Sequence, residues 1–184
     1  MKIKSSVDDA PNRLNHAICE RHKELFDLKV LTTYFTRSGN TEMIVKKIHE
    51  SVGGDVELIK ESVNRKGVVG WLKTGGGNAK REVTEINETI YDPAEYDLVI
   101  LASPIWAGTV SSPMRSYMMM NRDKLDRTAI FLTNDSGAVD AAFSEIYELL
   151  NTKPLVEASL QRSKMKNEFE STVTSFIENI QALG

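Results

Sequence analysis

Apolar runs typical of β-strands alternate with amphipathic helical patterns along residues 28–184, and this alternation limits the fold more than any other feature of the sequence. The clearest run is D-L-V-I-L-A-S at 97–103. It is almost unbroken in apolar residues, as is typical of a strand buried on both faces of a parallel sheet. Strands separated by helices favour a parallel sheet with helices on both faces. We therefore expect an α/β fold.

The strand and helix patterns follow one another at regular intervals. Strands are predicted at 28–35, 55–60, 97–103, 128–133 and 153–160, the last of these being the least distinct. Helices are predicted at 41–52, from Pro113 onward, at 139–150 and at 169–180, where apolar residues recur at helical spacing. Residues 61–94 break this pattern, and we expect a loop there with one short helix.

The length of 184 residues fits one domain, which we place at 28–184. Residues 1–27 lie outside the alternation and form an expected N-terminal extension, helical after Pro11. The glycine-rich segment 64–80 is either a structural connection or a cover for a ligand. The former is the more frequent role of such a segment.

Charge and cysteine content exclude several classes of function. A net charge of −3 argues against a nucleic-acid partner, because phosphate backbones bind basic surfaces. The single cysteine, Cys19, excludes a disulfide framework and a four-cysteine iron–sulfur cluster, so redox chemistry requires a bound cofactor. No apolar stretch reaches the length of a membrane span or of a signal peptide, and we expect a cytoplasmic protein without membrane contact. The three histidines show no metal-binding spacing, and we predict no metal site.

The first strand ends in T-R-S-G-N-T at 36–41, directly before a helix. Three hydroxyls and one glycine precede a helix N-terminus, whose backbone amides and dipole favour an anion. The segment lacks the Gly-Lys-Ser/Thr of a Walker loop and the three glycines of a dinucleotide-binding loop. We interpret it as a phosphate site of neutral donors; a polar turn without ligand is the alternative.

Together with S-P-I-W-A-G-T at 103–109, this loop resembles the flavodoxin family, and the resemblance covers residues 28–184. It implies a flavodoxin-like, three-layer, doubly wound five-stranded parallel sheet of order 2-1-3-4-5. One FMN would bind non-covalently at the carboxyl edge, where the order reverses. The residues that the resemblance assigns to the FMN phosphate are Thr36, Arg37, Ser38, Gly39, Asn40 and Thr41.

By the same resemblance, two further loops enclose the flavin ring. The second loop consists of Pro104, Ile105, Trp106, Ala107 and Gly108, and the third of Asn134, Asp135, Ser136 and Gly137. Trp106 is expected to form an apolar wall, with core packing as the alternative. A peptide within 106–108 would meet the flavin N5 atom, and glycine there allows a backbone change at little energetic cost. The third loop lacks the aromatic residue of many flavodoxins, and Asp135 either lies near the flavin or caps a turn.

The resemblance implies electron transfer to redox partner proteins, by a monomer or homodimer. No acid, base or nucleophile is predicted beside the ring, so we assign no catalytic residue and leave the redox chemistry to the cofactor. The alternative is an FMN-dependent NAD(P)H or quinone oxidoreductase of the same fold. A third class, the phospho-acceptor receiver domain, needs acidic residues at the end of the first strand. The sequence there is Thr33-Tyr34-Phe35-Thr36, so the acidic residues of a receiver domain cannot be placed.

Overall fold

The computed structural model describes residues 28–62 and 83–183, which form an α/β sandwich of three layers. The predicted N-terminal extension 1–27 and the glycine-rich segment 64–80 lie outside the described residues. The central sheet has five parallel strands: β1 (Val30–Tyr34), β2 (Asp55–Leu58), β3 (Leu98–Trp106), β5 (Thr128–Asn134) and β6 (Val156–Gln161). Their order, β2-β1-β3-β5-β6, confirms the predicted 2-1-3-4-5 arrangement.

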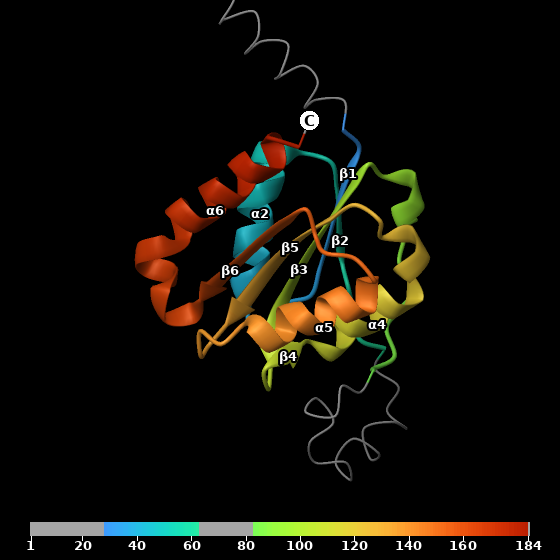
Figure 1. Ribbon diagram of the computed structural model, residues 1–184, viewed down its shortest axis with the longest axis horizontal. Coiled ribbons are helices and arrows are strands. Elements are labelled where there is room, and N and C mark those ends of the chain that lie inside the picture. The colour runs from blue at the N-terminus through green and yellow to red at the C-terminus, as the bar shows by residue number, and fades with distance from the viewer. Residues whose placement is uncertain (1–27, 63–82, 184) are drawn as a thin grey trace, which may run out of the picture.

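Among the described residues, two helices cover each face of the sheet (Figure 1). α2 (Asn40–Val52) and α6 (Met165–Gln181) lie on one face, and α4 (Ser112–Met120) and α5 (Asp140–Leu150) lie on the other. Short 3₁₀ helices occur at η2 (Pro93–Glu95), η3 (Arg122–Lys124) and η4 (Arg162–Lys164). Because a parallel sheet covered in this way brings its carboxyl strand ends to one edge, the loops after β1, β3 and β5 are neighbours.

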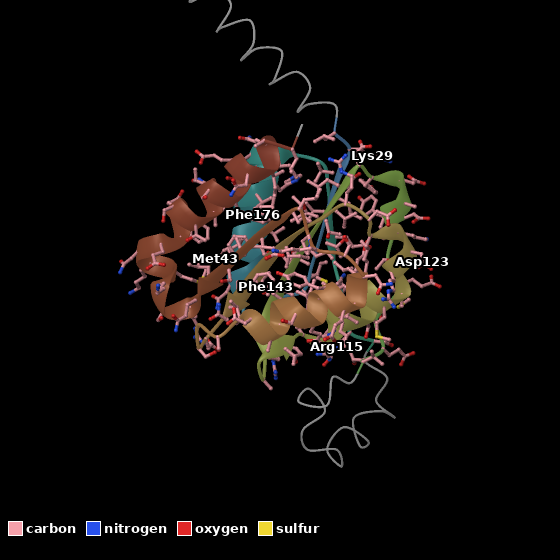
Figure 2. All side chains as sticks on the ribbon, viewed as in Figure 1. Lys29, Met43, Arg115, Asp123, Phe143 and Phe176 are labelled. Atoms are coloured by element: carbon pink, nitrogen blue, oxygen red, sulfur yellow. The ribbon has the colours of Figure 1, made fainter. Side chains whose placement is uncertain are left out.

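The core is divided by the sheet, since successive strand residues point to opposite faces. On β3, Leu98 and Ile100 face α2 and α6, whereas Val99 and Leu101 face α4 and α5. Figure 2 places Phe176 on the α6 side of the sheet and Arg115 near α4. The apolar run at 97–103 is therefore buried on both faces, as its composition predicts.

The structure corrects the second predicted loop. β3 continues through Pro104, Ile105 and Trp106, and β4 (Thr109–Val110) pairs with it in antiparallel fashion, Ile105 with Val110 and Trp106 with Thr109. Only Ala107 and Gly108 form the turn. The predicted loop is therefore the tip of a β-hairpin that projects beyond the parallel sheet.

The other differences are shifts of element boundaries. The strand predicted at 153–160 spans 156–161, and the helix predicted at 169–180 begins at Met165, since its polar first turn carries little apolar signal. Across residues 28–62 and 83–183, no helix is both long and apolar enough to cross a membrane.

Candidate functional site

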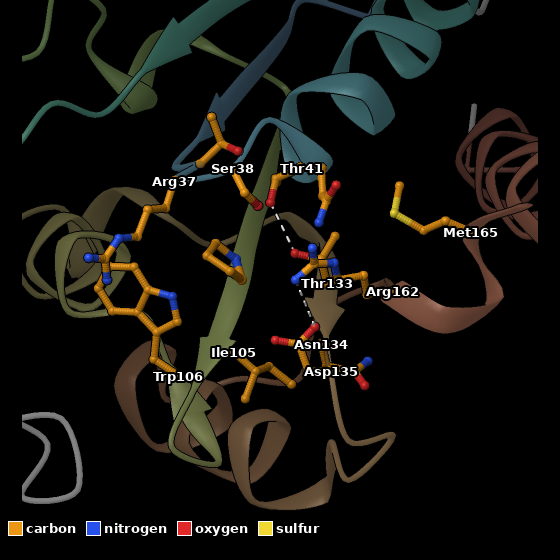
Figure 3. Close-up of a pocket in the computed structure, with 13 residues that line it drawn as sticks. Arg37, Ser38, Thr41, Ile105, Trp106, Thr133, Asn134, Asp135, Arg162 and Met165 are labelled. Atoms are coloured by element: carbon orange, nitrogen blue, oxygen red, sulfur yellow. Dashed lines mark hydrogen bonds and ion pairs between the residues drawn. The ribbon is translucent and has the colours of Figure 1, made fainter.

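One pocket lies at the carboxyl edge of the sheet, where the three predicted loops meet (Figure 3). Its volume is about 180 Å³. Ten of its lining residues are among those predicted from the sequence: Thr36, Arg37, Ser38, Asn40, Thr41, Pro104, Ile105, Trp106, Asn134 and Asp135. The topology thus brings together side chains that are up to about 100 residues apart in the chain.

The loop of residues 36–41 is shaped by Gly39, the residue before α2. Gly39 has φ +85°, a left-handed conformation that glycine adopts without strain, and its N–H donates to Thr36 Oγ1 at 3.1 Å. A glycine has no side chain that could cap the first-turn N–H groups of α2. These amides and the neighbouring hydroxyls form a donor set suited to a phosphate.

Thr41 connects this loop to the centre of the sheet. Its hydroxyl, on the first turn of α2, lies 3.0 Å from the hydroxyl of Thr133 near the end of β5. Both residues are buried and both line the pocket. This hydrogen bond holds the helix N-terminus against β5.

The hairpin tip has two consecutive residues with positive φ, Ala107 at +49° and Gly108 at +80°. Two such residues are the signature of the type I′ turn, which matches the twist of the strands it joins. Thr109 Oγ1 donates to Trp106 O at 3.0 Å and closes the turn. The backbone of 106–109 is therefore held in one conformation beside the pocket.

Trp106 is half-buried and contacts two residues of the first loop region. Its ring meets the ring of Phe35 edge to face, with centroids 5.3 Å apart and planes at 88°. The guanidinium carbon of Arg37 lies 5.8 Å from the indole centroid, within cation–π range. Trp106 both packs on the core and lines the pocket, so the two interpretations of the sequence do not exclude each other.

The third loop is closed by Asn134 rather than by Asp135. Asn134 is buried, and its Oδ1 accepts a hydrogen bond from Gly137 N at 2.6 Å. Asp135 is exposed, its backbone carbonyl accepts from Gln161 Nε2 at 3.0 Å, and its carboxylate faces Arg162. The turn-capping role considered for Asp135 therefore belongs to its neighbour.

Five residues predicted for the site do not line the pocket. They are Gly39, Ala107, Gly108, Ser136 and Gly137, which shape the loops around the pocket instead. Three further residues complete the lining and were not predicted from the sequence: Thr133, Arg162 and Met165. Arg162 directly follows β6, so a sharper prediction of where that strand ends would have placed it at the carboxyl edge.

The charged side chains of the lining are two arginines and one aspartate, Arg37, Arg162 and Asp135. A net positive lining on a chain of net charge −3 favours an anionic ligand. Within the part of the chain that the structure describes, no three metal-ligating side chains come together. The positive lining and the donors of the first loop suit an anion held by hydrogen bonds.

No family model matches the sequence, and a search of curated proteins finds no match. Solved structures do match. A flavoprotein of Lactobacillus acidophilus NCFM in complex with FMN has TM-score 0.60 and 20% identity, over 76% of this chain and 97% of that one. A Fusobacterium nucleatum flavodoxin bound to flavin mononucleotide has TM-score 0.55 and 10% identity, over 84% and 98%. An NADH:FMN oxidoreductase in its apo form has TM-score 0.51 and 13% identity, over 84% and 89%.

These matches, with the strand order and the position of the pocket, define the class: the chain has the flavodoxin-like fold. The fold that the sequence resemblance implied is thus confirmed.

Proposed function

We propose that this protein binds one FMN non-covalently in the pocket at the carboxyl edge and serves in electron transfer. The observation that carries the proposal is the convergence of an uncapped helix N-terminus, a half-buried indole and a polar third loop on one pocket. The flavoprotein of Lactobacillus acidophilus and the flavodoxin of Fusobacterium nucleatum, which share this fold, were solved with FMN.

The residues present fit the parts of FMN. The amides at the start of α2, with the hydroxyls of Thr36, Ser38 and Thr41, would hold the phosphate, because neutral donors at a helix N-terminus suit an anion. The hairpin of 104–110 would hold the ring, with Trp106 as an apolar wall and the turn peptides as backbone partners. Asn134 and Asp135, from the third loop, line the same pocket.

Bound FMN would supply one- and two-electron transfer, and the side chains would bind it, orient it and limit its contact with water. Within the described residues, no aromatic side chain of the third loop lines the pocket. The third loop instead places the exposed Asp135 at the pocket, so this part of the site reaches the molecular surface. This openness suits a carrier that exchanges electrons at its surface.

The alternative is an FMN-dependent NAD(P)H or quinone oxidoreductase, which one structural match, an NADH:FMN oxidoreductase, keeps in consideration. The lining supports the carrier more, because the donors of the first loop suit one phosphate and, within the described residues, no basic side chain other than Arg37 and Arg162 lines the pocket.

Anaerobic reduction of the FMN-loaded protein tests the proposed function. We expect stepwise reduction by a chemical reductant and no steady oxidation of NADH or NADPH when a quinone is supplied. Steady NAD(P)H turnover with the quinone would establish the oxidoreductase instead. A protein that takes up no FMN would contradict both functions.

A further inference from the structure

The two arginines that line the pocket have different contacts. Arg37 extends from the first loop, and its guanidinium lies over the indole of Trp106 at 5.8 Å. Arg162 begins η4, directly after β6, and its Nη1 lies 3.9 Å from Asp135 Oδ1. The side chains of Arg162 and Asp135 are 68% and 80% exposed, so their ion pair is weak and easily exchanged for another.

The fold places Arg162 opposite the predicted phosphate loop. η4 leads into α6, which packs beside α2, and Met165 at the start of α6 lines the same pocket as Asn40 at the start of α2. Figure 3 shows Arg162 extending into the pocket and linked to Asp135, with Thr133 beside it. A phosphate at the N-terminus of α2 would therefore face a cation across the pocket.

We propose that Arg162 binds the phosphate of FMN and sets the specificity of the site for the phosphorylated flavin over riboflavin. This inference rests on the proposed FMN function. The hydroxyls and amides of the first loop are neutral donors, and a guanidinium adds a planar pair of charge-assisted hydrogen bonds to a dianion. Arg162 also offsets the charge of Asp135, which would otherwise repel the phosphate.

In this proposal the two arginines have different roles, Arg162 at the phosphate and Arg37 at the ring. Arg37, which the sequence resemblance assigned to the phosphate, stays over Trp106 and supports the apolar wall. Because FMN and riboflavin share the same ring and differ in the phosphate, a change at Arg37 affects both ligands equally. A change at Arg162 affects FMN alone.

The test compares the dissociation constants of FMN and riboflavin for the full chain and its variants, by quenching of flavin fluorescence at low ionic strength. R162Q is expected to weaken FMN binding about tenfold, as the loss of one charge-assisted contact implies, and to leave riboflavin binding unchanged. R37Q is expected to weaken both ligands by the same factor. A circular dichroism spectrum and an unfolding curve verify that each variant is folded.

Lys164 provides the matched control. It lies on the same short helix, pairs with Glu168 at 3.2 Å and does not line the pocket, so K164Q removes one positive charge without removing a pocket contact. We expect K164Q to bind both flavins as the natural chain does. An equal loss of FMN affinity in R162Q and K164Q would show that Arg162 acts only through the overall charge of the protein, and would overturn the proposal.

Three further results are decisive. FMN binding unchanged in R162Q, or a loss of riboflavin affinity equal to that of FMN, would overturn the role of Arg162 while the FMN function stands. A loss of FMN affinity alone in R37Q would return the phosphate contact to Arg37. If the natural chain binds neither flavin, the proposed function fails, and this inference fails with it.

Discussion

Arg115 Nε and Glu145 Oε1 lie 2.6 Å apart, and both side chains are 2% exposed, so α4 and α5 are joined by an ion pair inside the protein. The same two side chains hold the backbone of β4. Arg115 donates to Val110 O at 2.9 Å, and Glu145 Oε2 accepts from Val110 N at 3.1 Å. A strand of two residues thus gains partners for its polar groups from two helices. This buried pair anchors the hairpin that carries Trp106.

We expect Glu145→Ala to lower the free energy of unfolding by about 3–5 kcal/mol, because it leaves a buried guanidinium without its counter-charge and Val110 N–H without an acceptor. Urea unfolding measures the change. The control is Ser144→Ala at the exposed neighbouring position, with an expected effect within about 0.5 kcal/mol. A loss for Glu145→Ala as small as that of the control would show that the pair does not stabilise the fold.

The two residues of the hairpin turn are expected to respond in opposite directions to exchange of alanine and glycine. Ala107→Gly relieves a left-handed alanine at φ +49° and should raise the free energy of unfolding by about 0.5–1 kcal/mol. Gly108→Ala introduces the same strain at φ +80° and should lower it by about 1 kcal/mol; no atom within 4 Å blocks the added Cβ. If urea unfolding shows that both variants change the free energy of unfolding in the same direction, the type I′ turn is contradicted.

Local patterns in the sequence predict most of this fold. The unbroken apolar run of β3 and the helical spacing in α5 each lie within a short stretch of sequence, and residues 36–41 are contiguous, so the layers and the place of this loop beside the pocket can be predicted. The hairpin cannot be predicted in this way, because β4 is only two residues long. Its backbone hydrogen bonds depend on Arg115 and Glu145, which lie on separate helices. Arg162 was missed for a related reason: its place in the pocket depends on where β6 ends.

Trp106 is expected to contribute to flavin binding through its ring rather than through any polar contact. Trp106→Ala should weaken binding of FMN and of riboflavin by the same factor, about three- to tenfold, the worth of one aromatic stacking contact. Trp106→Phe keeps an aromatic ring and should retain most of the affinity. Titration by flavin fluorescence measures both. If Trp106→Ala binds both flavins unchanged, the indole is only a core residue that packs on Phe35.

We expect Tyr117 to make the free energy of unfolding fall at alkaline pH. Its ring is buried, and burial, aided by the charge of Glu57, raises the pKa of its hydroxyl to about 12, against an ordinary value near 10. Above pH ~10 the unfolded chain releases this proton while the folded chain keeps it. The contribution of Tyr117 is therefore complete below pH ~10, and roughly 3 kcal/mol of stability is lost as the pH rises to about 12.

Tyr117→Phe tests this pH dependence. The variant should be less stable by about 1 kcal/mol at neutral pH, because the buried hydroxyl of Thr33 loses the acceptor to which it donates at 3.2 Å. Between pH ~10 and ~12 its stability should fall less steeply than that of the natural chain. Urea unfolding at several pH values gives the dependence of the free energy of unfolding on pH for both proteins. If the two dependences are the same, Tyr117 does not cause the loss of stability at alkaline pH.

An isothermal titration of the full chain, freed of any flavin, with FMN measures the proposed cofactor binding itself. We predict saturable binding of one FMN per chain and release of the flavin when the protein is unfolded, since binding is expected to be non-covalent. Affinity should fall in Gly39→Ala, because that residue shapes the phosphate loop at φ +85°. The absence of saturable FMN binding by a folded chain would contradict the proposed function.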